Sequence, residues 1–409
     1  NKCTGTSATG NFGITIAATS RMLYNWNFDT TSGSFWIDST DTNAIVVPAG
    51  GEAILYMYAN KFITKFTNFK DYSWTSLSDI DLPSLLSLDL TGLSINADNF
   101  FIGGVYNSST GKGLKNIETL ILNGVILTGD DASSYTLDVS NCNHLKHLDI
   151  GSSNITSVNL PTSAVLENYI LSNTGINSFV FKDQSFVENI DLTGCNNCLS
   201  IDIENCASLR SITIPSSVQT IKIINCDIFE TLTYPYSSIN SSISPLTSII
   251  VDNCPSLITV DIHGQNNTTL VVNLVGATGL QTLNLSGTSA NSIILPGSFT
   301  SLTSLDISYT NISYLTYNGV TPKDYLDLSA FIMKSLHCNS NKSLTKIVCK
   351  NIQGTTCNLM DYAFYGCSAL TRIVGNYKVT GSGVFKSCSQ FTLNPSSIYA
   401  SFSPSDFIT

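Results

Sequence analysis

The chain has 409 residues, of which 43% are hydrophobic and 12% are charged, and its formal net charge is −10 at pH 7. An average protein carries about 25% charged residues, so hydroxyl and amide side chains supply most of the polar surface here. The acidic balance disfavours nucleic acid and anionic membranes as partners, because both require clustered Lys and Arg. No apolar stretch reaches the roughly 20 residues that a membrane-spanning helix needs.

Residues 1–75 show no sequence repeat and contain all three tryptophans of the chain, including Trp36. A β-hairpin is expected over residues 44–58, where two apolar runs flank the turn residues 48–51. We predict that this segment forms a β-rich N-terminal cap, because the first coil of a repeat array exposes apolar surface that must be covered. A sugar-stacking aromatic patch is the alternative hypothesis for the same segment.

From residue 76 to 350, an apolar-x-apolar-x-x-Cys/Asn/Thr phrase recurs every 10 or 11 residues. The leading apolar residues recur with a period of 21 or 22, so one structural unit contains two phrases; examples are Leu145, Leu166, Val187 and Leu209. This period is typical of leucine-rich repeats, whose coils bury their apolar faces by stacking. Two apolar residues separated by one outward residue predict a short strand. The expected fold is therefore a mostly β solenoid with two short strands per 21–22-residue coil and little helix.

The array is irregular near residues 96–136 and 232–246, where Ser, Asn and Gly residues predict protruding loops. From residue 351 the phrase changes, and the segment that begins at Ala363 returns one unit later at Val384. We therefore divide the chain into an N-terminal cap (1–75), a leucine-rich-repeat solenoid (76–350), and C-terminal repeats with an end segment (351–409).

The cysteines follow the repeat, which argues against a disulfide framework. Five of the twelve lie three residues after the second apolar residue of a phrase: Cys142, Cys195, Cys206, Cys226 and Cys254. That position is expected to point inward, so we predict reduced and buried thiols. Cys195 and Cys198 form a CxxC pair, but no second pair of Cys or His lies at metal-site spacing. Neither a metal nor another cofactor is expected.

Aspartates occupy many of the outward positions between the two apolar residues. We select Asp149, Asp191 and Asp202, together with Thr213 and Trp36, as candidate ligand-facing residues. Like charges on neighbouring strands repel each other, and the spacing places Ile170 between Asp149 and Asp191. A solvated strand face is therefore expected in place of a calcium column or a catalytic carboxylate pair. The sequence contains no nucleophile elbow, phosphate-binding loop or HExxH motif, and no catalytic residues are assigned.

Three segments resemble known surface proteins. Residues 363–373, AFYGCSALTRI, resemble the AFxgCssLtsI core of BspA-like leucine-rich repeat proteins, and residues 209–218, LRSITIPSSV, resemble their LtsItIPssV phrase. Residues 302–312, LTSLDISYTNI, are similar to a bacterial surface class with the repeat LtsLdvsxNxL. The resemblance covers residues 76–391, although the spacing is degenerate and Cys or Thr often replaces Asn. It implies exported bacterial surface proteins that bind host or matrix proteins, glycans or other cells without catalysis.

The expected function is thus non-catalytic recognition or adhesion at a bacterial cell surface, with a protein or glycan partner held by an extended solenoid face. One alternative is a receptor-binding fibre domain of a phage or virion. Another is a glycan-processing enzyme domain, which needs two carboxylates about 5–10 Å apart in an aromatic cleft. Asp38, in the aromatic N-terminal segment, is the candidate carboxylate for that activity. The chain begins at Asn1, so we expect a signal segment and a lipid-attachment cysteine upstream.

Overall fold

In the computed structural model, the described residues belong to two units, Asn1–Leu199 and Ser200–Thr409. The backbone is described for the strands up to residue 76, and the structure is described in full for residues 82–83, 85–101, 104–162, 166–235, 243–349 and 357–392. The helices in these ranges are two short 3-10 turns. No helix in these ranges is long and apolar enough to cross a membrane.

The first unit consists of short strands joined by turns. Its elements are β1 (Lys2–Ser7), β2 (Ile14–Ala18), β3 (Met22–Phe28), β4 (Thr31–Ile37), β5 (Glu52–Met57), β6 (Ile63–Asn68), β7 (Tyr72–Ser76), β8 (Ser87–Asp89), β9 (Ser94–Asn96), η2 (Ala97–Asn99), β10 (Tyr106–Asn107), β11 (Lys112–Gly113), β12 (Thr119–Ile121), β13 (Ile126–Thr128), η3 (Asp130–Ser134), β14 (Thr136–Asp138), β15 (His147–Asp149), β16 (Ser157–Asn159), β17 (Asn168–Ile170), β18 (Ser178–Lys182) and β19 (Asn189–Asp191).

The N-terminal strands pair antiparallel with one another and then continue into parallel ladders. Strand β1 pairs with β5 and β7, β3 pairs with β4 and β5, and β2 pairs with β6, all antiparallel. Parallel pairing begins at β6 with β8 and at β7 with β9. The N-terminal strands therefore extend two sheets of the first unit, with the orders β13-β9-β7-β1-β5-β3-β4 and β17-β15-β12-β8-β6-β2.

The N-terminal segment is β-rich as predicted, and its role as a cap stays a prediction. Strand β5 matches the second strand of the expected hairpin, whereas residues 38–51 lie outside the described residues. The irregular stretch at residues 96–136 contains the small β10–β11 hairpin and both 3-10 turns. Its insertions therefore form local structure between strands that remain paired.

The second unit is built from parallel strands only, within its described residues. Its strands are β20 (Ser200–Glu204), β21 (Ser211–Thr213), β22 (Thr220–Ile224), β23 (Thr231–Thr233), β24 (Ser248–Asp252), β25 (Thr259–Asp261), β26 (Val271–Asn273), β27 (Thr282–Asn284), β28 (Ser292–Leu295), β29 (Ser304–Asp306), β30 (Thr316–Tyr317), β31 (Leu326–Leu328), β32 (Ser335–His337), β33 (Lys346–Cys349), β34 (Cys357–Leu359), β35 (Arg372–Val374) and β36 (Tyr377–Val379).

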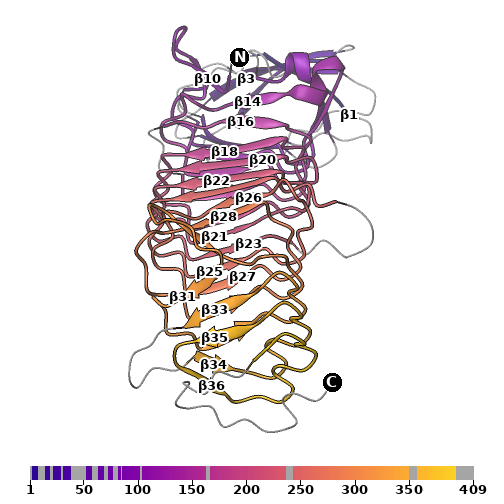
Figure 1. The fold of residues 1–409 in the computed structure, drawn as a ribbon. Helices are drawn as coiled ribbons and strands as arrows, with labels where there is room; N and C mark the ends of the chain where they lie inside the picture. Colours follow the sequence, from indigo (N-terminus) through magenta and orange to yellow (C-terminus); the bar gives the residue numbers. More distant parts are fainter. Residues whose placement is uncertain are drawn as a thin grey trace. The chain divides into compact units, whose positions relative to one another are not determined.

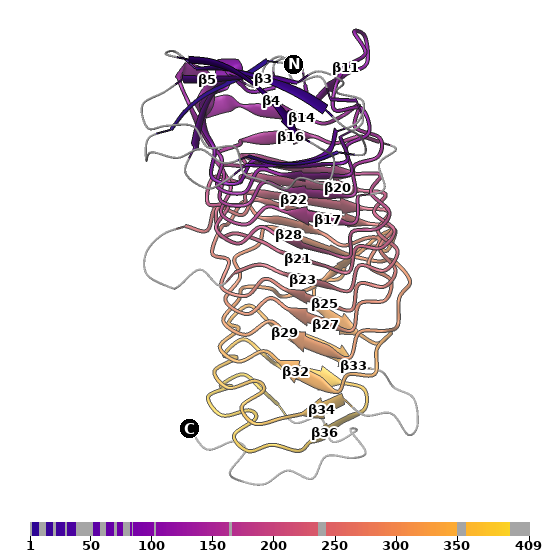
Figure 2. The same ribbon diagram turned by 180° about the vertical axis from the view of Figure 1, so that it is seen from behind.

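Alternate strands of the second unit enter two different sheets, as Figures 1 and 2 show from opposite sides. Within the second unit, the first sheet has the order β20-β22-β24-β26-β28-β30, and the second has β21-β23-β25-β27-β29-β32. The remaining strands form two smaller sheets, β31-β33-β35 and β34-β36. From β20 to β30, the chain thus contributes one strand to each of the two larger sheets in every coil. This arrangement confirms the predicted fold, a mostly β solenoid of the leucine-rich repeat type with two short strands per coil.

The apolar residues of each phrase form the core between the sheets. In β20, Ile201 and Ile203 are buried while Asp202 between them faces outward. Val251 in β24 and Leu283 in β27 are likewise completely buried. Burying a side chain of this size contributes about 1.5–3 kcal/mol. The alternation that predicted the strands therefore also supplies the free energy that holds neighbouring coils together.

Coil length varies more than the sequence period predicts. Thr282 pairs with Ser304, which lies 22 residues later in the sequence, whereas Ser304 pairs with Ser335, which lies 31 residues later. The separation of 28 between Thr231 and Thr259 includes the predicted loop at 232–246, of which residues 236–242 lie outside the described residues. Because both longer coils keep their strands paired, the insertions lie in the turns and leave the sheet register intact.

The inward cysteine position is confirmed. Eleven cysteines are described, all of them free, and all but Cys388 are buried. The Cys195 thiol donates to the Leu171 carbonyl of the preceding coil at 3.2 Å, and the Cys226 thiol donates to the Ile224 carbonyl at 3.4 Å. The thiols therefore fill the core and also bind carbonyl groups at the bends. Among the described residues, no group of three or more His, Cys, Asp or Glu could hold a metal ion.

Candidate binding surface

Six strands of the second unit carry a continuous line of hydroxyl groups. These residues pair in register along one sheet and make up the hydroxyl column: Ser211, Thr231, Thr259, Thr282, Ser304 and Ser335. Each side chain is exposed or half-buried. Paired residues of neighbouring strands are about 4.8 Å apart. One hydroxyl group is therefore presented per coil at nearly constant spacing.

A second column lies two residues further along the same strands. It contains Thr233, Asp261, Asn284, Asp306 and His337, again paired in register. Residues two apart in a strand point to the same side of a sheet, so both columns share one surface. We call the two columns together the polar face.

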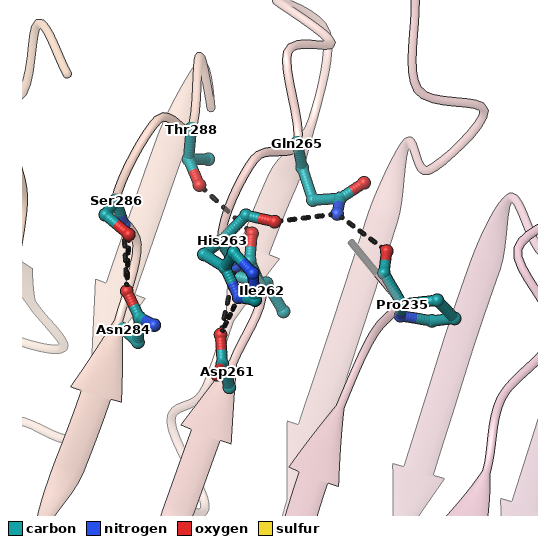
Figure 3. A network of polar contacts seen from close by, with 8 residues as sticks. All are labelled: Pro235, Asp261, Ile262, His263, Gln265, Asn284, Ser286 and Thr288. Atoms are coloured by element: carbon teal, nitrogen blue, oxygen red, sulfur yellow. Dashed lines mark hydrogen bonds and ion pairs between the residues drawn. The ribbon is translucent and has the colours of Figure 1, made fainter. Parts of the chain in front are cut away.

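Local turns fix the side chains of the second column. Oδ1 of Asn284 accepts hydrogen bonds from the backbone N–H and the hydroxyl of Ser286, at 3.1 and 2.8 Å (Figure 3). Oδ1 of Asp306 accepts the backbone N–H of Ser308 at 2.9 Å. Asp and Asn commonly bind the backbone two residues on, which starts a turn. The same contact that ends each strand therefore also orients its carboxylate or amide.

Polar side chains also support the turn that follows Asp261 (Figure 3). Nε2 of Gln265 donates to the carbonyls of Pro235 and His263 at 3.1 and 3.0 Å, and so joins two coils. The Thr288 hydroxyl donates to the Ile262 carbonyl at 3.1 Å. His263 donates from Nδ1 to Oδ1 of Asp261 at 2.6 Å. Hydrogen bonds within the protein therefore hold the turn after Asp261 and join it to the neighbouring coil.

The polar face carries few charges. Its carboxylates, Asp261 and Asp306, are separated by Asn284 in the column. An ion pair between Arg210 and Glu230 lies at the margin, and both side chains are nearly half exposed. An exposed pair of this kind contributes about 0–1 kcal/mol. The surface therefore offers fixed donors and acceptors of hydrogen bonds, with little net electrostatic attraction.

Two of the residues selected from the sequence shape turns in the first unit. Oδ1 of Asp149 in β15 accepts the backbone N–H of Gly151 at 2.8 Å and also receives Nδ2 of Asn123 at 3.2 Å. Asp191 in β19 accepts the backbone N–H of Thr193 at 2.9 Å. We expected these carboxylates simply to face solvent. Their local bonds give them a structural role as well.

The other selected residues do not gather at one site. Asp202 lies in the first sheet of the second unit, where Lys222 Nζ is 3.2 Å from its Oδ1. Thr213 is exposed on β21, the first strand of the polar face. Trp36 belongs to β4, and its side chain lies outside the described residues. Thr213 thus lies on a strand that contributes Ser211 to the polar face, two residues beyond it.

The predicted separation of like charges is confirmed for the described pairings. Asp149 pairs with Ile170, and Asp138 pairs with Asn159. Carboxylates directly opposite each other on neighbouring strands would repel. The described registers instead place an apolar residue, an amide, a hydroxyl, Lys or His next to each strand Asp.

Sequence reasoning missed the hydroxyl column, although its signal is present. A Ser or Thr comes directly before the first buried residue in Ser211-Ile212, Thr231-Leu232 and Thr259-Val260. The signal for the turns was also present, since Asp306-Ile307-Ser308 repeats the spacing of Asn284-Leu285-Ser286. Each pattern is short and common, so only pairing in the sheet shows that its members line up.

A hollow of about 530 Å³ in the first unit brings together carboxylates and aromatic residues. It is lined by Asp98, Asp131 and Asp138 and by Phe100, Phe101 and Tyr135, among others. Phe100 and Phe101 are 0% and 5% exposed, so their rings belong to the core and cannot stack on a sugar. Burial raises the pKa of Tyr135 well above its usual value, and nearby Asp138 adds to the rise. Its hydroxyl donates to the Phe100 carbonyl, which makes it part of the scaffold.

No protein-family model matches this chain, and no curated protein matches it. Among solved structures, the chain is similar to YopM from Yersinia enterocolitica WA-314, with 14% sequence identity. The match covers 77% of this chain and 78% of that chain, with a TM-score of 0.22. At this identity and TM-score, the similarity adds nothing to the fold or function.

Proposed function

We propose that this protein is a non-catalytic recognition protein that binds a protein or glycan partner through its polar face. The observation that carries the proposal is the register of the two columns, which line up hydroxyl, amide and carboxylate groups along six strands. Hydrogen bonds within their turns already hold the side chains of Asn284 and Asp306. A surface that is ordered beforehand loses little conformational entropy on binding.

The proposal places the protein at the bacterial cell surface, as a BspA-like adhesion protein. Support comes from the C-terminal phrase, whose apolar positions are core residues: Ala363, Phe364, Cys367, Leu370 and Ile373. The recurrence of this phrase is also structural, because the rings of Phe364 and Phe385 stack with centroids 5.7 Å apart. The low share of charged residues, 12%, fits an extracellular location.

A panel of immobilised glycans and matrix proteins tests the proposal when it is combined with a reducing-end assay on the same glycans. Thr282→Arg would place a bulky cation in the hydroxyl column, and we expect it to abolish binding. Val271→Arg is the matched control, because Val271 begins a three-residue strand with the same burial pattern in the opposite sheet. The control should bind like the unmodified protein.

The same experiment separates the alternatives. Release of reducing ends that is lost in Asp138→Asn or Asp38→Asn would contradict the non-catalytic proposal and support a glycan-processing enzyme. The gene neighbourhood decides the origin, since virion tail genes would indicate a phage receptor-binding fibre. A signal segment with a lipid-attachment cysteine upstream would support the bacterial surface.

A further inference from the structure

We infer that the partner of the polar face is a neutral, linear, β-linked polysaccharide that lies along the direction of strand stacking, with one sugar unit per coil. This inference rests on the proposed function and narrows its partner class. It is carried by three observations: the spacing of the columns, the chemistry of their side chains, and two unpaired polar atoms at one end of the face.

The spacing favours a sugar chain over a peptide. The columns repeat once per strand, about every 4.8 Å, whereas an extended peptide presents side chains on one face about every 6.8 Å. A pyranose in an extended β-linked chain advances the chain by a distance close to one strand step. A polysaccharide can therefore place one sugar unit on each successive coil, with neighbouring units presenting alternate faces, whereas a peptide falls out of register after one or two coils.

The chemistry favours a neutral sugar chain. Sugar hydroxyls donate and accept hydrogen bonds, and Ser and Thr hydroxyls can accept from them and donate to them in turn. Asp261 and Asp306 each use one carboxylate oxygen in their turn and keep the other, whereas Asn284 uses its single oxygen in the turn and presents its side-chain amide N–H groups as donors. Asp261 and Asp306 would repel the carboxylates or sulfates of an anionic polysaccharide, so a neutral chain fits this face better.

Two buried polar atoms support a ligand hydroxyl at the C-terminal part of the face. Ser308 is 3% exposed, and neither its Oγ nor Oδ1 of Asn339 has a hydrogen-bond partner among the described residues. The two residues occupy neighbouring coils, because the N–H of Tyr309 binds the Asn339 carbonyl at 2.8 Å. A buried polar group without a hydrogen-bond partner destabilises the protein, so a group that pairs with it is favoured. One O–H group between them would accept from Ser308 and donate to Asn339.

Exposed tyrosines lie near this position, one through the sequence and one through a backbone hydrogen bond between coils. Tyr309 directly follows Ser308 and is 67% exposed, and Tyr365, whose carbonyl accepts the N–H of Ser340, is 40% exposed. Tyrosine combines an apolar ring with a polar hydroxyl, which suits contact with a sugar. We therefore expect the polysaccharide to bind most strongly at the C-terminal part of the polar face, which we call the anchor.

Calorimetric titration with neutral oligosaccharides, from the disaccharide to the hexasaccharide, tests the inference. The probes are β-1,4-linked gluco-, xylo-, manno- and N-acetylglucosamine oligosaccharides. In at least one series, affinity should rise about tenfold or more from the disaccharide to the hexasaccharide, which corresponds to about 1.4 kcal/mol per tenfold. An oligosaccharide longer than the hexasaccharide should gain little further affinity, because six strands carry the hydroxyl column.

Matched variants locate the sugar chain. Asn284→Ala should lower the affinity for the hexasaccharide about tenfold, whereas Asn273→Ala should leave that affinity unchanged. Asn273 forms the same turn, accepting the N–H of Val275 at 3.2 Å, but lies in the opposite sheet. Ser308→Ala should lower the affinity without lowering the melting temperature. Unchanged affinity in Ser308→Ala would show that an ordered water alone satisfies this hydroxyl, and would overturn the proposed anchor.

The outcomes also separate this inference from the proposed function. Binding to a matrix protein, with no binding in any of the four oligosaccharide series, overturns the inference and leaves the proposed function standing. Affinity that does not depend on chain length, or that is lost equally in Asn284→Ala and Asn273→Ala, also overturns it. Failure to bind any glycan or protein of the panel contradicts the proposed function itself.

Discussion

Asn225 donates a hydrogen bond from its side-chain amide to Oδ1 of Asn205, one coil away, at 2.8 Å. Asn253 continues the ladder by donating to Oδ1 of Asn225 at 2.9 Å. All three residues have a positive φ, between 46° and 58°, in the left-handed region that Asn tolerates better than most residues. Asn therefore suits these bends for two reasons. Its backbone tolerates the left-handed conformation, and its side chain can both donate and accept a hydrogen bond.

Two substitutions at Asn225 should separate these contributions. Asn225→Gly keeps the backbone conformation and removes two exposed hydrogen bonds, so the free energy of unfolding should fall by about 1 kcal/mol. Asn225→Ala should cost about 1–2 kcal/mol more, because alanine is strained in the left-handed region. Urea denaturation measures both. An alanine variant as stable as the glycine variant would show that the bend is not fixed.

The strand register is tested by Ile203→Asp. Ile203 is completely buried, so an unpaired carboxylate there should cost several kcal/mol. Asp202→Ser should cost at most about 1 kcal/mol, because the ion pair with Lys222 is partly exposed. Lys222 also retains an ion pair with Glu204, at 3.9 Å, when Asp202 is replaced. Equal melting temperatures for the two variants would contradict the register.

Thiol labelling tests the burial of the cysteines. In the native protein, the described cysteines other than Cys388 are buried, and we expect iodoacetamide to label them only after unfolding. Cys388 should react first, because it is partly exposed. Mass spectrometry counts the labelled thiols. Three or more disulfides between repeat-position cysteines would overturn this prediction.

Alkaline pH should destabilise the protein. Burial raises the pKa of Cys367 to about 12 and that of Cys388 to about 11, with Cys388 adding to the rise at Cys367. In the unfolded chain, a thiol has a pKa of about 8.5. The unfolded state therefore loses these protons first, and the stabilisation is present in full below about pH 8.5 and is lost as the pH rises through 11–12.

The measurement is the melting temperature as a function of pH, which should fall between about pH 9 and 12. A double variant, Cys367→Ala with Cys388→Ala, should be less stable at neutral pH but should show a shallower fall. The comparison concerns the slope, since the new cavities lower stability at every pH. An unchanged slope would assign the alkaline transition to other groups.

Gln265→Leu tests the internal polar contacts. Gln265 is completely buried, and its amide oxygen accepts the Ser244 hydroxyl at 2.5 Å while Nε2 serves the Pro235 and His263 carbonyls. Leucine fills similar volume but leaves these partners without the amide, so the cost should be about 3 kcal/mol or more. Gln281→Leu, at an exposed position, should be nearly neutral in the same denaturation experiment. Equal costs would refute a special role for Gln265.

The sequence by itself determined the core and the class of fold. The alternation around Ile201 and Ile203 could be interpreted from the chain because a strand has a period of two and one of its faces must be buried. The inward cysteines followed from the same phrase, since they keep a fixed offset from Val139, Leu192 and Ile223. Local patterns decide these features because each depends on residues within a few positions of one another.

Only the tertiary structure decided which outward residues share a surface. Ser211, Thr231 and Thr259 form one column, although the distance along the sequence differs between the first pair and the second. Turn insertions change the sequence distance between paired strands without changing their pairing, so a fixed period cannot align the outward positions. Backbone hydrogen bonds between strands set the register, and with it the polar face, the asparagine ladder and the separation of the carboxylates. These long-range pairings form only when the coils stack.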